Sequence, residues 1–112
     1  GYYFENAELF LLDNKIEIKG LKSFVTKQPI GLVLGVMPWN FPFWQVFRFA
    51  IPVILSGNGA ILKHASNVQG CANAIETCFQ NSGFPDGIFR NLALVGKNVS
   101  KLIGDPLIKA IS

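Results

Sequence analysis

The spacing of apolar residues changes along the 112-residue chain and predicts a different element in each stretch. In residues 1–12 the apolar side chains lie three and four positions apart, which is typical of a helix. Residues 15–19 alternate charged side chains with isoleucine, and together with residues 23–26 they predict two strands with one solvated face, joined at Gly20. We therefore expect residues 1–28 to form a helix and a hairpin-like segment that precede the main domain.

A longer and more apolar pattern begins at residue 29. Residues 30–37 form a continuous apolar run, as in a strand that is covered on both faces of a parallel sheet. Shorter runs predict further strands at residues 60–62, 88–95 and 107–111. Helical patterns separate them at residues 43–56, with an interruption or kink at Pro52, from residue 66 to Gly83, and at residues 99–103. This alternation predicts an α/β fold with a doubly wound, mostly parallel sheet and right-handed crossovers.

The helix after residue 66 carries two further predictions. Ser66 is followed three residues later by Gln69, which is the pattern of a capping box with Ser66 as the N-cap. Cys71 and Cys78 belong to the apolar stripe of this helix, so we expect both thiols in the core. Seven helical residues separate them by roughly 10 Å, and a disulfide between them is therefore excluded.

Composition and charge argue against several classes of function. Ten basic and seven acidic residues give a net charge of +3 without a long basic block, so we expect no nucleic-acid partner. Residues 28–47 carry no charge and are long enough to span a bilayer, but their prolines and glycines fit a buried strand, a turn and a buried helix better. We therefore expect no membrane partner. Two cysteines and an opening segment unlike a signal peptide favour a reducing, cytoplasmic location.

Polar clusters follow the first two strands of the predicted sheet. Pro38-Trp39-Asn40 comes after the first strand, and residues 63–66 come after the second. Parallel strands bring their carboxyl ends to one edge, where such sheets bind ligands. The chain has no G-x-G-x-x-G loop, P-loop, H-E-x-x-H or C-x-x-C motif. Its only histidine, His64, has no neighbouring ligands in the sequence, so we expect no metal site.

Four blocks resemble the aldehyde dehydrogenase superfamily: Pro29-x-Gly31, Met37-Pro38-Trp39-Asn40-Phe41-Pro42, Gly57-Asn58 and Leu62-Lys63. The similarity to its succinate-semialdehyde dehydrogenase branch is greatest in residues 41–48, 62–68 and 70–72. The resemblance implies that residues 29–112 are part of an incomplete Rossmann-like NAD(P)-binding domain and that residues 1–28 carry oligomerisation strands. It also implies that the catalytic cysteine and the glutamate base lie beyond Ser112.

The resemblance assigns roles to single residues near both clusters. Asn40 matches the asparagine whose amide binds the oxyanion of the thiohemiacetal; the alternative is an asparagine that only forms the turn between two prolines. Lys63 matches a lysine that hydrogen-bonds the adenosine ribose, although a solvated strand end also accounts for a lysine. The implied cofactor contacts are Met37, Pro38, Trp39, Asn40, Lys63, Ser66 and Gly96.

Ser66 bears on the choice of cofactor. NAD-preferring relatives often carry glutamate here, which accepts from the ribose 2′-hydroxyl and repels a 2′-phosphate, so serine leaves both NAD and NADP open. Helix capping is a compatible role for the same side chain. His64 departs from the family pattern, in which proline usually follows the lysine, and this leaves the local backbone open.

Three residues match positions that contact the aldehyde: Phe41, Gln45 and Arg48. Phe41 and Gln45 correspond to the lining of the aldehyde tunnel. Arg48 corresponds to an arginine that binds the distal carboxylate of a semialdehyde, which suits a planar guanidinium. The alternative for Arg48 is an ion pair with an acidic residue elsewhere in the protein.

Two functions of different classes remain open. One is part of an NAD(P)-dependent, homo-oligomeric aldehyde dehydrogenase that oxidises an aldehyde, such as succinate semialdehyde, to the carboxylate, with the chain alone inactive. The other is a non-catalytic nucleotide-binding or assembly module. Formation of NAD(P)H in the presence of aldehyde distinguishes the two.

Overall fold

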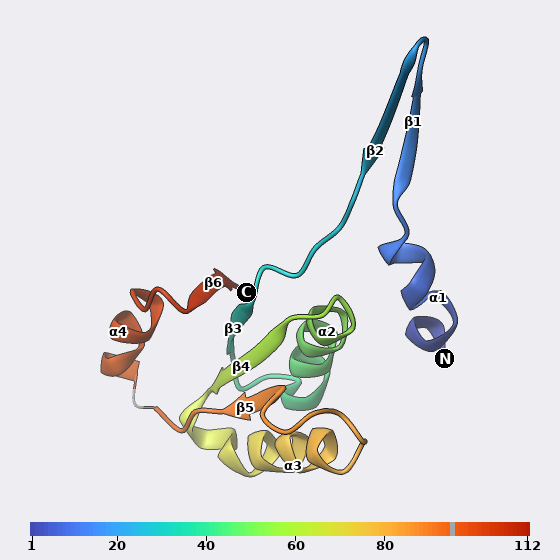
Figure 1. Ribbon diagram of the computed structural model, residues 1–112. Coiled ribbons are helices and arrows are strands. Elements are labelled where there is room, and N and C mark those ends of the chain that lie inside the picture. The colour runs from blue at the N-terminus through green and yellow to red at the C-terminus, as the bar shows by residue number, and fades with distance from the viewer. Residues whose placement is uncertain (95) are drawn as a thin grey trace.

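The computed structural model describes residues 1–94 and 96–112, which form a helix-covered parallel sheet and a projecting hairpin (Figure 1). The helices are α1 (Tyr2–Leu11), α2 (Pro42–Leu55), α3 (Gln69–Gln80) and α4 (Val99–Ile103), with 3₁₀ turns at Ser66–Val68 and Gly96–Asn98. The strands are β1 (Asn14–Ile18), β2 (Leu21–Val25), β3 (Leu32–Met37), β4 (Gly59–His64), β5 (Phe89–Asn91) and β6 (Ile108–Ile111). Each predicted element is present, but β5 is shorter than predicted, and residue 95 of its predicted range lies outside the described residues.

Strand β3 lies inside a parallel sheet with the strand order β5-β4-β3-β6. From β3 the chain passes through α2 to β4 and through α3 to β5, and then crosses back to place β6 on the other side of β3. The winding therefore reverses between β3 and β6, and the predicted doubly wound α/β fold is confirmed. In sheets of this type, ligands bind outside the carboxyl ends of the strands at such a reversal.

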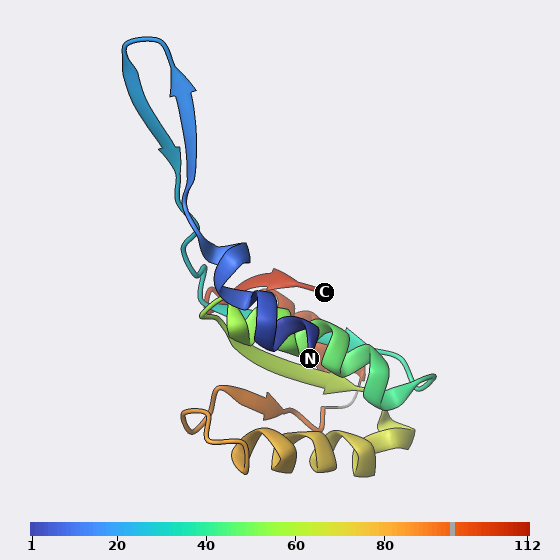
Figure 2. The ribbon, with the colours of Figure 1, turned by 90° about the vertical axis from the view of Figure 1, so that its right-hand side faces the viewer.

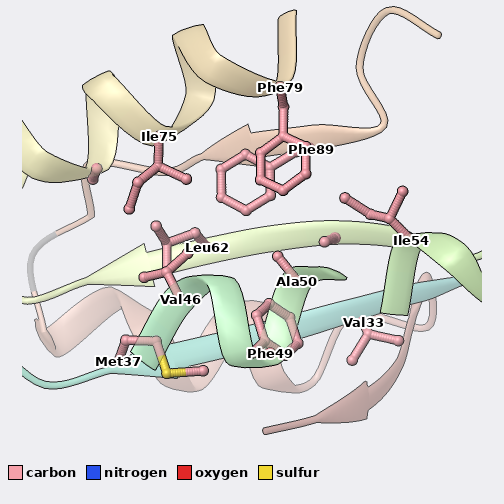
Figure 3. Close-up of a cluster of buried hydrophobic side chains, with 12 residues drawn as sticks. Val33, Met37, Val46, Phe49, Ala50, Ile54, Leu62, Ile75, Phe79 and Phe89 are labelled. Atoms are coloured by element: carbon pink, nitrogen blue, oxygen red, sulfur yellow. The ribbon is translucent and has the colours of Figure 1, made fainter. Parts of the chain in front are cut away.

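The main core lies between one face of this sheet and the helices α2 and α3 (Figure 3). Successive residues of a strand point to opposite faces, so Leu62 enters this core while its neighbours Ile61 and Lys63 face the other side. Phe79 of α3 stacks on Phe89 of β5 with ring centroids 4.6 Å apart. The side of the sheet that a β4 residue faces therefore follows from its position in this alternation.

Helix α2 continues through Pro52, so the predicted interruption is wrong. Pro52 lacks an N–H, but its carbonyl accepts hydrogen bonds from the Ser56 N–H (3.1 Å) and the Ser56 hydroxyl (2.8 Å). Packing also holds the helix, because Phe49 lies against Gly35 of β3. A Cβ at Gly35 would lie 2.5 Å from the Phe49 ring, so glycine lets α2 approach the sheet closely.

The start of α3 differs from the predicted capping box. A 3₁₀ turn at Ser66–Val68 precedes the helix, and no side chain of the described residues caps either start. Gln69 instead donates to the carbonyl oxygens of His64 (3.3 Å) and Ala65 (3.2 Å). The prediction is wrong because the end of β4, brought near by the fold, supplies acceptors that compete with the helix terminus.

The thiols of α3 lie beside its buried stripe. The buried residues of this helix are Ala72, Ile75 and Phe79. Cys71 is half-buried and Cys78 is exposed, and both are free. The prediction of a core thiol is therefore wrong for Cys78, since the residue directly before Phe79 is turned about 100° away from it around the helix axis.

Strands β1 and β2 form an antiparallel hairpin that projects from the rest of the molecule (Figure 2). Gly20, in the turn as predicted, has φ +84°. The pairing places four apolar residues on one face of the hairpin: Ile16, Ile18, Leu21 and Val25. All four are exposed, so the prediction of a single solvated face is wrong among the described residues, because none of them covers this face.

Helix α1 contacts α2 near the base of the hairpin. Tyr3, Phe10 and Leu55 are among the residues that line the hollow between the two helices. No helix of the described residues combines the length and the apolar character that crossing a membrane requires.

Candidate active site

A short loop, residues 38–41, joins the carboxyl end of β3 to the start of α2 and carries Asn40. Phe41 has φ +50° and ψ +55°, and is the only non-glycine residue of the described chain with a positive φ. This left-handed conformation costs a bulky residue about 1–3 kcal/mol, and strain of this kind clusters at functional sites. Pro42 follows as the first helical residue, where its fixed φ suits the helix start. The loop therefore turns sharply and leaves Asn40 at the surface.

Asn40 lies in a hollow of about 430 Å³, which we call the loop hollow, with Phe41, Trp44, Gln45 and Arg48. The last four are spaced as one face of a helix start, so α2 presents them together. The Asn40 side chain is exposed and forms no hydrogen bond with the described residues. An asparagine that serves only the turn would hydrogen-bond the nearby backbone. The amide is therefore available to a ligand.

Arg48 is the only charged residue that lines the loop hollow. Its side chain is exposed and pairs with no carboxylate of the described residues. Phe41 and Trp44, 70% and 67% exposed, supply aromatic walls beside it. The hollow thus combines a cation, a neutral amide donor and apolar surface, which suits a small molecule with a carboxylate at one end.

A second hollow of about 380 Å³, the switch-point hollow, lies where the winding of the sheet reverses. Met37 and Pro38 line it from the end of β3, and Ser112 lines it from beyond the end of β6. Gln45 and Arg48 line both hollows, which are therefore neighbours. The structure thus brings six of the predicted site residues together: Met37, Pro38, Asn40, Phe41, Gln45 and Arg48.

The remaining predicted residues lie at the same edge but do not line these two hollows. Lys63 is half-buried near the end of β4 and faces away from the α2 and α3 core, and its ladder partner Val36 lines the switch-point hollow. Trp39 is 65% exposed in the loop. Ser66 and Gly96 each begin a 3₁₀ turn and are exposed.

Sequence reasoning missed a set of buried contacts beneath the loop. His64 is fully buried, and its Nε2 atom lies 3.0 Å from the carbonyl oxygen of Pro42. Gln69 holds the backbone of His64 and accepts a hydrogen bond from the Asn91 amide (3.1 Å). The polar character of His64 in an otherwise apolar alternation along β4 was the one available signal. No three histidine, cysteine, aspartate or glutamate side chains of the described residues gather as metal ligands.

A doubly wound parallel sheet with a hollow at its switch point is the architecture of dinucleotide-binding domains. The fold and the site therefore define the class as a nucleotide-binding α/β domain with an amide and a cation beside the cleft. A family model described as the aldehyde dehydrogenase family matches residues 1–112. The chain belongs to the aldehyde dehydrogenase family.

Individual relatives agree with this assignment. A probable NADP-dependent succinate-semialdehyde dehydrogenase of Synechocystis is 50% identical over 109 residues, covering 97% of this chain and 24% of the relative. A succinate-semialdehyde dehydrogenase of Escherichia coli, named for NAD(P), is 40% identical over 99% of this chain and 24% of its own length. The crystal structure of succinic semialdehyde dehydrogenase from Streptococcus pyogenes in complex with NADP is 33% identical, with a TM-score of 0.94 over 98% of this chain and 24% of that one. The chain thus spans about a quarter of the length of these relatives.

Proposed function

We propose that the protein to which this chain belongs oxidises an aldehyde to the carboxylate with NADP, and that the aldehyde is succinate semialdehyde. The observation that carries the proposal is the uncommitted amide of Asn40, which lies in a hollow that shares Gln45 and Arg48 with the hollow at the switch point. The names of the relatives from Synechocystis and Escherichia coli supply the substrate class and the cofactor.

Asn40 acts, in this proposal, on the charge that develops during attack on the aldehyde. A cysteine thiolate from another part of the protein adds to the carbonyl carbon, and the carbonyl oxygen becomes an oxyanion. A neutral amide N–H held at that oxygen stabilises the charge without offering a proton. Helix α2 begins two residues later, and the positive end of its dipole adds to the effect. The strained Phe41 and the rigid Pro42 restrict the loop, so less reorganisation is needed when the charge forms.

Arg48 holds the other end of the substrate in this proposal. Succinate semialdehyde carries a carboxylate opposite its aldehyde, and a guanidinium binds a carboxylate through two parallel hydrogen bonds. Arg48 and Asn40 line the same hollow, so one short substrate can reach both. The alternative ion pair for Arg48 finds no partner among the carboxylates of the described residues.

The residues at the switch point fit one part of a dinucleotide. Met37 and Pro38 offer backbone at the end of β3, and Lys63 lies across the ladder from Val36 at the same edge. Ser66 is exposed and uncharged, and residues 63–70 contain no acidic side chain that would repel a 2′-phosphate. This favours NADP. When bound, the cofactor accepts the hydride that converts the cysteine adduct into a thioester, which water then hydrolyses to the carboxylate.

NADPH formation tests the proposed function. The full-length protein should form NADPH when succinate semialdehyde is added, as measured by absorbance, whereas the 112-residue chain should form none because it lacks the nucleophile. Turnover by the 112 residues alone would contradict the division of labour. Binding of NADP by a full-length protein that reduces none with any aldehyde would instead support a non-catalytic nucleotide-binding module.

The projecting hairpin supports assembly with a second copy of this chain as part of the same proposal. Four exposed apolar side chains share one face of it, and burying each would contribute about 1.5–3 kcal/mol. Replacing Ile16 and Ile18 together by serine should reduce the oligomer in sedimentation velocity. The control replaces Lys15 and Glu17, on the opposite face, by serine and should leave the oligomer intact. Equal sedimentation of both double variants would exclude the hairpin face as the interface.

The free thiols bear on the location of the protein. Cys71 and Cys78 are both unpaired. Unpaired thiols persist in reducing compartments. We therefore place the protein in the cytoplasm.

A further inference from the structure

The imidazole of His64 lies beneath the loop that carries Asn40. His64 is the last residue of β4 and is fully buried. Its Nε2 atom lies 3.0 Å from the carbonyl oxygen of Pro42, at the start of α2, and its Nδ1 atom lies 3.3 Å from the carbonyl oxygen of Met37, at the end of β3. The ring therefore spans the two ends of the loop.

The hydrogen-bond partners define which ring nitrogen carries hydrogen. The backbone N–H of Ala65 donates to Nδ1 at 3.0 Å, so this nitrogen presents its lone pair. The ring hydrogen then lies on Nε2, which donates to the carbonyl oxygen of Pro42. With this tautomer the carbonyl of Met37 only packs against Nδ1. One directed hydrogen bond thus joins the end of β4 to the first residue of α2.

The imidazole is itself held from below. Gln69 donates to the carbonyl oxygens of His64 (3.3 Å) and Ala65 (3.2 Å). Asn91, at the end of β5, donates to the side-chain oxygen of Gln69 (3.1 Å). The ladder pairs His64 directly with Met37, which ends β3 beside the loop. The position of the ring is therefore set by β3, β4, β5 and α3 together.

We propose that His64 is the positioning residue for the Asn40 amide. It is the only side chain of the described residues that hydrogen-bonds residues 37–42, and Pro42 lies two residues from Asn40. A bond at this point limits how far the start of α2 can move from β4, and so limits the direction of the amide. The inference rests on the proposed role of Asn40, because without an oxyanion there is nothing to position.

Three substitutions in the full-length protein test the proposal. His64→Gln keeps a donor at the place of Nε2 and should retain kcat to within about threefold. His64→Asn keeps a polar atom only at the place of Nδ1, and His64→Leu keeps neither. Both should lower kcat by about 10- to 100-fold, as expected when a catalytic group is displaced by about 1 Å. The KM for NADP should stay within about twofold, since the switch-point hollow is unchanged.

A double-mutant cycle separates positioning from a general loss of structure. If His64 acts through Asn40, then His64→Asn should lower kcat less than about twofold in an Asn40→Ala background, because interacting sites are not additive. Effects that multiply would overturn the proposal, as would an unchanged kcat in His64→Asn alone. An Asn40→Ala variant with normal kcat would instead refute the proposed function itself.

Stability is controlled separately. Ile75→Val weakens the core far from the loop and should lower the melting temperature without a change in kcat. Should His64→Leu and His64→Asn fail to fold, the nitrogen NMR spectrum of the unmodified protein still decides. A hydrogen on Nε2 of His64 supports the proposal, and a hydrogen on Nδ1 overturns it.

Discussion

Replacement of Asn40 by alanine is expected to lower kcat of the full-length protein by about 10²–10³-fold, corresponding to roughly 2.7–4 kcal/mol of lost transition-state stabilisation. The amide forms no hydrogen bond with the described residues, so its removal breaks no contact of the folded chain. The affinity for NADP should change little, because Asn40 lines the loop hollow and not the switch-point hollow. Steady-state kinetics with succinate semialdehyde measures both quantities.

The control for this variant is Asn81→Ala. Asn81 is an exposed asparagine that follows the end of α3, and its side chain forms no hydrogen bond with the described residues. Its replacement should leave kcat and the melting temperature unchanged. A full rate in Asn40→Ala would show that the amide only shapes the turn, and the oxyanion role would have to be abandoned.

Replacement of Arg48 by alanine is expected to raise KM for succinate semialdehyde by about 10- to 100-fold, which corresponds to loss of a hydrogen-bonded charge of about 1.5–3 kcal/mol. The KM for pentanal, a neutral aldehyde of similar length, should change by less than about threefold. The difference should shrink at high ionic strength, because Arg48 is exposed and salt screens such charges. Comparison of kcat/KM for the two aldehydes measures the selectivity.

Arg90→Ala is the matched control. Arg90 is also exposed, but it pairs with Glu76 at 3.4 Å and lines neither hollow. Its replacement should affect both aldehydes equally and weakly. If Arg48→Ala raised both KM values equally and lowered the melting temperature, Arg48 would be an internal ion-pair residue and the substrate role would be refuted.

The local elements followed from the sequence because each depends on residues close together in the chain. The continuous apolar run before Pro38 predicted β3, which the structure has at Leu32–Met37. The lysine and isoleucine alternation predicted β1 and β2 in the same way. Both patterns report which faces of a segment avoid water, and this requires no knowledge of distant residues.

The errors arose where distant residues compete with local preference. Ser66 is a good helix cap in isolation, but Gln69, its expected partner, bonds the end of β4 instead. The chain continues helically through Pro52 because packing on the sheet and the Ser56 contacts compensate for the missing N–H. Apolar residues on the hairpin predicted a covered face, and the described chain contains none of the residues that would cover it.

The sequence by itself determined the order of strands and helices and placed two polar clusters at the ends of neighbouring strands, because periodicity and turn residues act over a few positions. Only the tertiary structure decided that β6 returns to the far side of β3, that Asn40 and Arg48 line one hollow, and that His64 reaches Pro42 beneath the loop. These relations join residues that lie far apart along the chain or on different elements. They depend on the path of the crossovers and on packing between layers, which no local pattern encodes.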